Sequence, residues 1–171
     1  MRLLENSAFD ELFQTFESSA FHLEVADQYD LPEESEPIRR FLAGEPDDLA
    51  WQKPWLDLIR RATSAGRRVE RLRVVSVPHR DYTRWLLTIS ASNIEAGEDI
   101  RWLRRDAVNG LALAADDFWL FDRERVVFTL FAADGSFAGG AETRDRAIVA
   151  HCRRVRDELW PVAVPHARYA R

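Results

Sequence analysis

Cysteine is almost missing from this 171-residue chain, and Cys152 is the only one. A single cysteine excludes an intrachain disulfide and a thiolate-rich metal site. Long apolar runs are missing too, since no window approaches the roughly 18 apolar residues that span a bilayer. The N-terminal segment MRLLENSAFDELF lacks the apolar core of a secretion signal. We therefore expect a cytoplasmic protein without a membrane partner.

The sequence also lacks the short motifs that identify many enzymes. It contains no Gly-x-Ser-x-Gly elbow, no Walker A loop and no glycine-rich dinucleotide turn. The four histidines, His22, His79, His151 and His166, are not spaced as helical or hairpin metal ligands. Only His79, at a predicted strand-to-helix turn, lies where α/β sheets hold ligands, although a solvent-exposed loop histidine is the commoner situation. From these patterns we predict no cofactor, no metal ion and no catalytic residue, while distant residues can still assemble a metal site.

Basic residues are in the minority, with 24 lysines and arginines against 29 aspartates and glutamates and a formal net charge of −5. Nonspecific nucleic-acid binding needs a basic face that displaces counterions, so we predict no direct nucleic acid binding. The chain also has no convincing helix-turn-helix pattern of its own. Hydrophobic residues make up 46% and aromatic residues 11% of the chain, which indicates a folded domain with a real core.

The predicted fold class is α/β (α+β), with a single mixed β-sheet flanked by helices. We expect one domain over residues 1–171, with an N-terminal helical part at about 1–66 and a core of sheet and helices at about 67–162. Within the N-terminal part, Ser7-Ala-Phe-Asp10 has the form of a capping box and predicts a helix start. Residues 21–25 alternate apolar and polar side chains, which is typical of an edge strand.

Two more helices are expected before the core, and they end near Gly44 and Gly66. The core then begins with a strand at residues 69–77, a helix that Asp81 can cap, and a strand at residues 99–104. A strand–helix–strand run of this length predicts that the two strands are parallel neighbours.

The C-terminal third is predicted to add a central strand at residues 118–121, a hairpin and a last helix. The hairpin joins residues 126–131 and 137–141 through Asp134-Gly135, a strong turn signal. Gly139 and Gly140 weaken its second strand and indicate a bulge or a close approach of the backbone. The last helix ends before Pro161.

Arg73 is the charged residue with the clearest implication, because it shares a strand face with Val69. A buried guanidinium without a partner is strongly destabilising. We therefore expect a carboxylate partner among Glu98, Asp117 and Asp122. A structural ion pair and an anion-binding role are equally compatible with this placement.

The helix after that strand opens with Asp81, Tyr82 and Arg84, and a helix N-terminus is a natural anion site. The next strand brings Glu98 and Arg101 back to the same neighbourhood if the two strands are parallel. These placements predict a ligand-binding surface with the following candidates: Arg73, Asp81, Tyr82, Arg84, Glu98, Arg101 and Asp122.

Four phrases carry a resemblance to a known family: RVERLRVV, Pro78-x-x-Asp81-Tyr82-x-Arg84, Asn93-x-x-Ala96-Gly97-Glu98-Asp99-Ile100-Arg101 and Asp117-Phe-Trp-Leu-Phe-Asp122. Over nearly the whole chain, the sequence resembles an uncharacterised actinobacterial domain-of-unknown-function family. The resemblance implies no activity. It does imply that genes of this family often lie beside genes for helix-turn-helix transcriptional regulators. This implies a link to regulation by association only.

The order of elements is also similar to one half of a phospholipase D-like domain, whose motif is His-x-Lys-x-x-x-x-Asp. With Asp122 at the aspartate of this motif, Ala115 stands at the histidine and Asp117 at the lysine. Alanine cannot attack phosphorus, and Asp117 would repel a phosphate. This resemblance therefore implies a scaffold that lacks the catalytic motif.

The favoured hypothesis is a non-catalytic regulatory or protein-interaction domain that works with a separately encoded DNA-binding regulator of the helix-turn-helix class. The alternative is a hydrolase acting on a phosphorylated or nucleotide-like substrate, with Glu98 and Asp122 as a carboxylate pair and Arg73 as a clamp. Convergence of these three side chains in one open pocket favours the hydrolase, and a sealed ion-pair network removes its basis. A homodimer that uses tryptophan-rich faces is compatible with either hypothesis.

Overall fold

One mixed sheet of eight strands organises the computed structural model, which describes residues 1–4, 6–108, 116–132 and 137–171. The strand order is β1-β7-β6-β5-β2-β3-β4-β8. Strands β2, β3 and β4 are parallel, and the other neighbouring pairs are antiparallel. The strands are β1 (Arg2–Leu4), β2 (Ser19–Glu24), β3 (Arg68–Val75), β4 (Asp99–Arg104), β5 (Phe118–Phe121), β6 (Arg125–Phe131), β7 (Phe137–Thr143) and β8 (Val164–Pro165).

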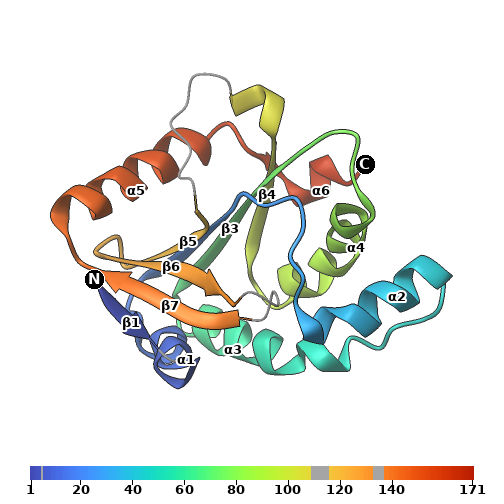
Figure 1. Cartoon of the computed structure of the whole chain (residues 1–171), viewed down its shortest axis with the longest axis horizontal. Coiled ribbons are helices and arrows are strands. Elements are labelled where there is room, and N and C mark those ends of the chain that lie inside the picture. The colour runs from blue at the N-terminus through green and yellow to red at the C-terminus, as the bar shows by residue number, and fades with distance from the viewer. Residues whose placement is uncertain (5, 109–115, 133–136) are drawn as a thin grey trace.

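The helices pack on both faces of this sheet, so the fold has three layers (Figure 1). Helix α5 covers one face, and α1, α3 and α4 cover the other. The described α-helices are α1 (Asn6–Thr15), α2 (Ser35–Ala43), α3 (Lys53–Ser64), α4 (Asp81–Glu95), α5 (Arg146–Leu159) and α6 (His166–Tyr169). Short 3-10 helices are η1 (Pro32–Glu34), η2 (Ala50–Gln52) and η3 (Arg105–Val108). None of the described helices is long and apolar enough to cross a bilayer.

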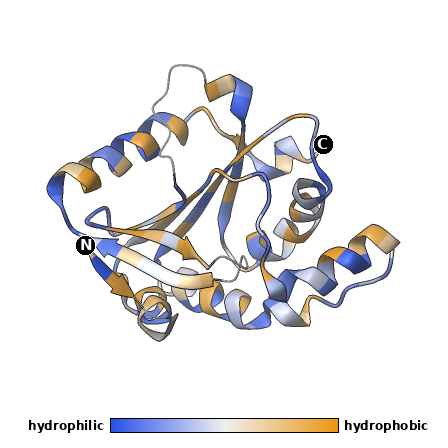
Figure 2. Ribbon diagram, viewed as in Figure 1, coloured by the Kyte–Doolittle hydropathy of each residue, from blue (hydrophilic) through white to orange (hydrophobic). Residues whose placement is uncertain are grey.

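The face under α5 is a continuous apolar core. Apolar and polar residues alternate along α5 (Figure 2), as expected for a helix with one buried stripe. Its apolar residues Val149, Cys152, Val155 and Leu159 pack on alternate residues of the central strands. The strand residues of this core are Phe21, Leu23, Leu72, Val74, Leu103, Phe118, Leu120 and Val126.

The opposite face holds two separate apolar clusters. One is formed by α1 and α3 with the start of β2 and β3, where Ala20 and Val69 are buried. The other lies under α4 and includes Val75 and Trp102 from β3 and β4. Between the two clusters, the central strands present polar side chains, and this gap contains the candidate site.

Most of the predicted elements are confirmed. The fold class is α/β with a single mixed sheet, β3 and β4 are parallel neighbours, and β5 is a central strand. Strands β6 and β7 pair antiparallel, and α5 ends before Pro161. A Cβ at Gly140 would collide with Val127, which confirms the predicted close approach of the backbone.

Two expectations about elements are wrong. Residues 21–25 do not form an edge strand, because β2 lies between β5 and β3 at the centre of the sheet. Asp81 does not cap α4: it is the first helical residue, Arg80 is the N-cap, and the Asp81 side chain accepts a hydrogen bond from Arg84. Strand β1, which was not predicted, joins the sheet beside β7. The side chain of Ser7, the Asp134-Gly135 turn and Ala115 lie outside the described residues.

Candidate functional site

Four polar side chains from two neighbouring parallel strands meet on the sheet face opposite α5. Their strand register pairs His22 of β2 with Arg71 of β3, and Glu24 with Arg73. Side chains alternate along a strand, so residues two apart point to the same face. The apolar residues between these polar ones, such as Leu23, point to the opposite face and into the α5 core. Two strands that each alternate in this way necessarily place their charges side by side.

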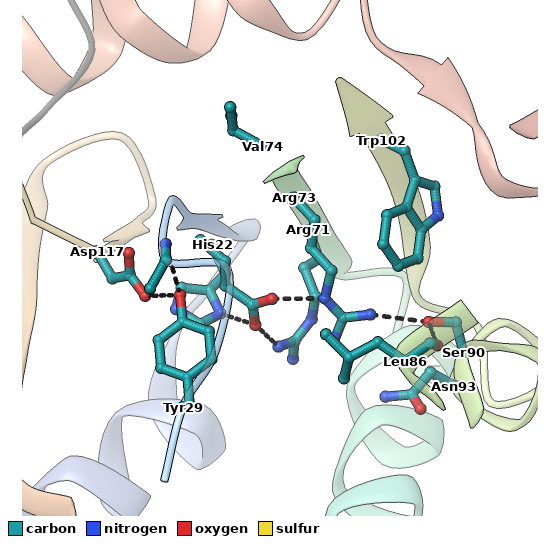
Figure 3. Close-up of polar contacts among 12 residues, drawn as sticks. His22, Tyr29, Arg71, Arg73, Val74, Leu86, Ser90, Asn93, Trp102 and Asp117 are labelled. Carbon is teal, nitrogen blue, oxygen red and sulfur yellow. Dashed lines mark hydrogen bonds and ion pairs between the residues drawn. The ribbon is translucent and has the colours of Figure 1, made fainter. Parts of the chain in front are cut away.

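Glu24 binds both arginines (Figure 3). Glu98 binds the remaining side of Arg71. Arg73 Nε donates to Glu24 Oε2 at 2.5 Å, and Arg71 Nη1 donates to Glu24 Oε1. Arg71 Nε donates to Glu98 Oε1 at 2.6 Å. We call His22, Glu24, Arg71, Arg73 and Glu98 the charged cluster.

Residues of α4 complete the hydrogen bonding of this cluster. Asn93 Nδ2 donates to Glu98 Oε2 at 2.9 Å, and Arg73 Nη1 donates to Ser90 Oγ at 2.8 Å. The Glu98 side chain is fully buried. Charges as buried as these are stable only when they are paired and hydrogen-bonded, and this network meets both conditions.

The arginines keep Glu24 ionised. Burial alone would raise the pKa of Glu24, but the positive charges of Arg73 and Arg71 together outweigh it and hold this pKa well below its usual value. Burial alone would lower the pKa of Arg71, and Glu98 and Glu24 together raise it instead. The charges therefore compensate each other within the protein.

His22 is the member of the cluster with an unpartnered nitrogen. Its ring stacks on Trp119, with centroids 4.1 Å apart and an angle of 12° between the planes. Nδ1 lies 3.2 Å from Glu24 Oε1, whereas Nε2 is buried without a hydrogen-bond partner among the described residues. Burial lowers the pKa of His22, and its contact with Glu24 offsets this only in part.

Two further carboxyl groups lie close to the cluster, and each is held by a tyrosine. Tyr29 donates its hydroxyl proton to Asp117 Oδ2, and the backbone N–H of Val25 donates to Asp117 Oδ1 at 2.8 Å. Tyr82 donates to Glu34 Oε2 at 2.8 Å. Burial raises the pKa of Asp117 and raises the pKa of Glu34 to about 7. These carboxyls are protonated more readily than Glu24.

These groups surround a cavity of about 420 Å³, which is within the size range of small-molecule sites. It lies between α1, α3, α4 and the sheet, with η1 and the segment after β2 at its side. We call it the aromatic pocket, because its wall includes Phe13, Tyr29, Trp51, Trp55, Tyr82 and Trp119. Phe131, at the end of β6, also lines it and is 41% exposed.

Unpartnered buried polar atoms are concentrated on the wall of this pocket. Within the described part of the chain, buried side-chain polar atoms without a hydrogen-bond partner occur at His22, Trp55 and Thr129. All three side chains line the aromatic pocket. Each such atom lowers the stability of the fold by about 1–3 kcal/mol when it has no hydrogen-bond partner. Their concentration on one wall indicates a place where hydrogen-bond partners come from outside the chain.

The structure brings three of the seven predicted site residues together. Arg73 and Tyr82 line the aromatic pocket, and Glu98 lies behind it in the charged cluster. The predicted partner of Arg73 is wrong: its carboxylate is Glu24 and not Glu98, Asp117 or Asp122. The error arises from the placement of residues 21–25 at a sheet edge, which would have left Glu24 in solvent.

The other four predicted residues lie elsewhere. Asp81 and Arg84 form an exposed ion pair on the first turn of α4. Arg101 pairs with Asp99 at 3.2 Å and donates to the backbone oxygen of Trp160.

Asp122 has a local structural role. Its carboxylate accepts hydrogen bonds from the backbone N–H groups of Glu17, Ser18 and Ser19, which fixes the start of β2. Burial would raise the pKa of Asp122, but these N–H donors outweigh it and lower the pKa. Glu98 and Asp122 share no hydrogen-bond partner, so they do not form a carboxylate pair around Arg73.

His79, the histidine at the strand-to-helix turn, is also engaged away from the pocket. Its Nδ1 lies 3.1 Å from the Ser76 oxygen and its Nε2 lies 3.1 Å from the Tyr169 hydroxyl. Sequence analysis missed His22, Glu24 and Arg71 as site residues. The available signal was the matching alternation of polar residues in two adjacent strands, His22 and Glu24 beside Arg71 and Arg73.

The described residues contain no group of three histidine, cysteine or acidic side chains placed to hold a metal ion. The side chains of the site form an ion-pair floor, aromatic walls, a histidine with a lowered pKa and two carboxyls with raised pKa values.

Comparison with known protein families gives a match to DUF6879, described as a domain of unknown function, over residues 7–171. A comparison with curated proteins finds none that matches the chain.

Proposed function

The chain belongs to the DUF6879 family, a domain of unknown function, and we propose that it is a non-catalytic regulatory or protein-interaction domain. In this proposal it acts in the cytoplasm with a separately encoded DNA-binding transcriptional regulator of the helix-turn-helix class. Recognition takes place at the aromatic pocket. A phospholipase D-like scaffold without its catalytic motif agrees with such a role, and a homodimer is compatible with it.

The observation that carries this proposal is the internal compensation of the buried charges. Glu24 accepts hydrogen bonds from both Arg71 and Arg73, and Glu98 accepts another from Arg71. An arginine clamp for phosphoryl transfer has to meet the substrate with unpaired charge. Because both guanidiniums are already paired, they support a rigid binding surface better than a hydrolytic site.

The composition of the wall also supports binding. Aromatic side chains provide large, stiff contact surfaces and are common at sites where binding energy is concentrated. Phe131 is partly exposed at the pocket and its ring lies 5.8 Å from that of Tyr29. An exposed phenylalanine beside a partly open pocket is a natural first contact for a partner.

The test is capture of purified helix-turn-helix regulators encoded near the gene, at micromolar concentration, by the wild-type protein and two variants. Phe131→Ala removes the aromatic side chain at the pocket and should weaken capture by at least about tenfold. Leu42→Ala is the matched control, because Leu42 is 56% exposed on α2 and does not line the pocket. The proposal fails if wild-type protein captures no such regulator, or if Phe131→Ala captures it as well as Leu42→Ala does.

A further inference from the structure

The charge balance of the aromatic pocket disfavours an anionic ligand. Two guanidiniums line the pocket, and both are already bound to Glu24. The carboxyl groups in the lining outnumber them and belong to Asp10, Glu24, Glu33, Glu34 and Asp117. An entering phosphate would meet an excess of negative charge, and desolvating it there would be unfavourable.

Glu34 and Asp117 are the partly buried carboxyls of this set that form no ion pair among the described residues. Each is held by a neutral donor, Glu34 by Tyr82 and Asp117 by Tyr29. The rings of these two tyrosines lie 6.0 Å apart, so the two carboxyls flank one tyrosine pair. Residues 5, 109–115 and 133–136 include no lysine, arginine or histidine, so they supply no cation either.

The aromatic walls already bind a guanidinium. Arg71 Cζ lies 5.6 Å from the ring centroid of Trp55 and 5.6 Å from that of Trp119, within the range of cation–π attraction. These rings and Trp51 all face the pocket lining. Surfaces of this kind attract a second cation in the same way when carboxylates lie beside them.

An independent observation indicates that a ligand completes this site. His22 is 9% exposed, lines the pocket and has no hydrogen-bond partner for Nε2 in the described structure. Trp55 Nε1 and Thr129 Oγ1 share this condition on the same wall. A ligand with its own donors and acceptors would satisfy groups that the folded chain leaves without partners.

We propose that the aromatic pocket binds an organic cation, a guanidinium or ammonium group on an apolar stem, through Glu34, Asp117 and the aromatic wall that includes Trp51 and Trp55. The inference rests on the proposed function, because it names the class of ligand that the same pocket takes. The neutral tyrosine donors position the carboxylates, and the aromatic rings cover the apolar stem.

Binding of a cation at Glu34 depends on pH. Burial raises the pKa of Glu34 to about 7, and the negative charges of Glu24 of β2 and the adjacent Glu33 add to this rise. The hydrogen bond from Tyr82 of α4 and the positive charge of Arg73 of β3 lower the pKa, but they do not cancel the rise. A bound cation favours the ionised form, so a proton leaves as the ligand enters. Affinity should then be about tenfold lower at pH 6 than at pH 8. Burial lowers the pKa of His22, which keeps this ring uncharged to lower pH than an ordinary histidine.

The experiment is a titration of the full chain with three small probes of similar size, followed by calorimetry and tryptophan fluorescence at pH 6 and pH 8. Butylguanidinium should bind, and bind more tightly at pH 8. Butylurea, its neutral counterpart, and butyl phosphate should bind at least about tenfold more weakly. Equal binding of butylurea, preferential binding of butyl phosphate, or no binding of butylguanidinium would each overturn the proposal.

Matched variants test the role of the carboxyl. Glu34→Gln keeps an acceptor for Tyr82 but removes the charge, so it should lower butylguanidinium affinity at pH 8 by at least about tenfold and abolish the pH dependence. Glu95→Gln removes an exposed charge at the end of α4 and should leave both unchanged. Circular dichroism verifies that both variants fold. A Glu34→Gln protein with wild-type affinity and pH profile would contradict the assignment.

A competition experiment between butylguanidinium and the regulator distinguishes a cation on a regulator side chain from a free small molecule. It also tests this inference independently of the proposed function. If butylguanidinium displaces the regulator, the cation belongs to a side chain of the regulator. If both bind together, it belongs to a small molecule. Regulator capture that requires Phe131 while butylguanidinium does not bind would refute the cation and leave the proposed function standing.

Discussion

The two faces of the sheet are built from alternate residues of the same strands, yet their interiors differ. Under α5, Phe21, Leu23 and Leu72 are buried in an apolar core. On the opposite face the neighbouring positions are His22 and Arg71, which belong to the charged cluster beside a cavity. One face is closed by a helix, and the other is left partly open between two groups of helices.

The two faces differ in how much each contributes to stability. Burial of apolar surface contributes roughly 25 cal/mol per Å², so the α5 face supplies stability without further conditions. A buried ion-pair network contributes little net stability, because desolvation offsets most of the attraction. We therefore propose that the network is retained for the recognition role proposed above.

The largest expected effect is that of Glu24→Ala. Removing this carboxylate leaves Arg73 without its acidic partner and Arg71 with one of its two, which should lower the free energy of unfolding by about 3–5 kcal/mol. Leu72→Ala on the α5 face should cost about 2–5 kcal/mol through its cavity. Urea unfolding measures both, with Glu95→Ala as a surface control. A loss below about 1 kcal/mol for Glu24→Ala would mean that the two faces do not differ in this way.

A smaller effect is expected for the pH dependence of stability. The pKa of Glu34 rises from its ordinary 4.5 to about 7 on folding, so the folded state holds this proton more tightly than the unfolded state. The stabilising contribution of the protonated Glu34 is complete below pH 4.5 and is lost as pH rises through 7. Glu34→Gln should remove this loss. Unfolding midpoints between pH 5 and pH 8 measure it, and identical slopes for wild type and variant would contradict the raised pKa.

Glu24 produces the opposite slope at lower pH. Its pKa is held well below the ordinary value on folding, so its contribution is present above pH 4.5 and lost as pH falls. The two carboxyls can thus be separated by the pH range in which each acts.

The smallest effect is expected at the exposed residues that sequence analysis placed in the site. Arg84→Ala breaks an ion pair with Asp81 whose side chains are 61% and 59% exposed. Surface pairs of this kind contribute about 0–1 kcal/mol, and neither residue lines the aromatic pocket. Urea unfolding and regulator capture should therefore both stay near wild type. Loss of capture in this variant would move the binding surface from the pocket to the start of α4.

Much of the fold could be predicted because the local signals were consistent. Residues 69–77 combine β-branched residues with a following proline, and residues 146–159 repeat apolar side chains at helical spacing, so β3 and α5 were identified. Strand β1 was not predicted, because a strand of three residues is too short to show an alternating pattern. The tail after Pro161 forms β8 and α6, and such short elements depend on tertiary contacts with β4.

The site could be predicted only in part, because its decisive contact joins residues 49 positions apart. Arg73 was correctly expected to need a carboxylate, but the choice of partner depended on where β2 lies in the sheet. The alternation in residues 21–25 has the same pattern for a solvated edge and for a central strand with a buried polar face. Sequence alone does not reveal that Arg71 and Arg73 lie beside the polar residues of β2 on the neighbouring strand.

The most direct test replaces the whole network at once with Glu24→Leu, Arg71→Met, Arg73→Leu and Glu98→Met, and compares unfolding with regulator capture. Because no charge is left unpaired, the free energy of unfolding should stay within about 2 kcal/mol of wild type or rise. Capture of the regulator should be lost. A folded quadruple variant that captures the regulator as tightly as the wild-type protein would contradict the claim that the charged face serves recognition.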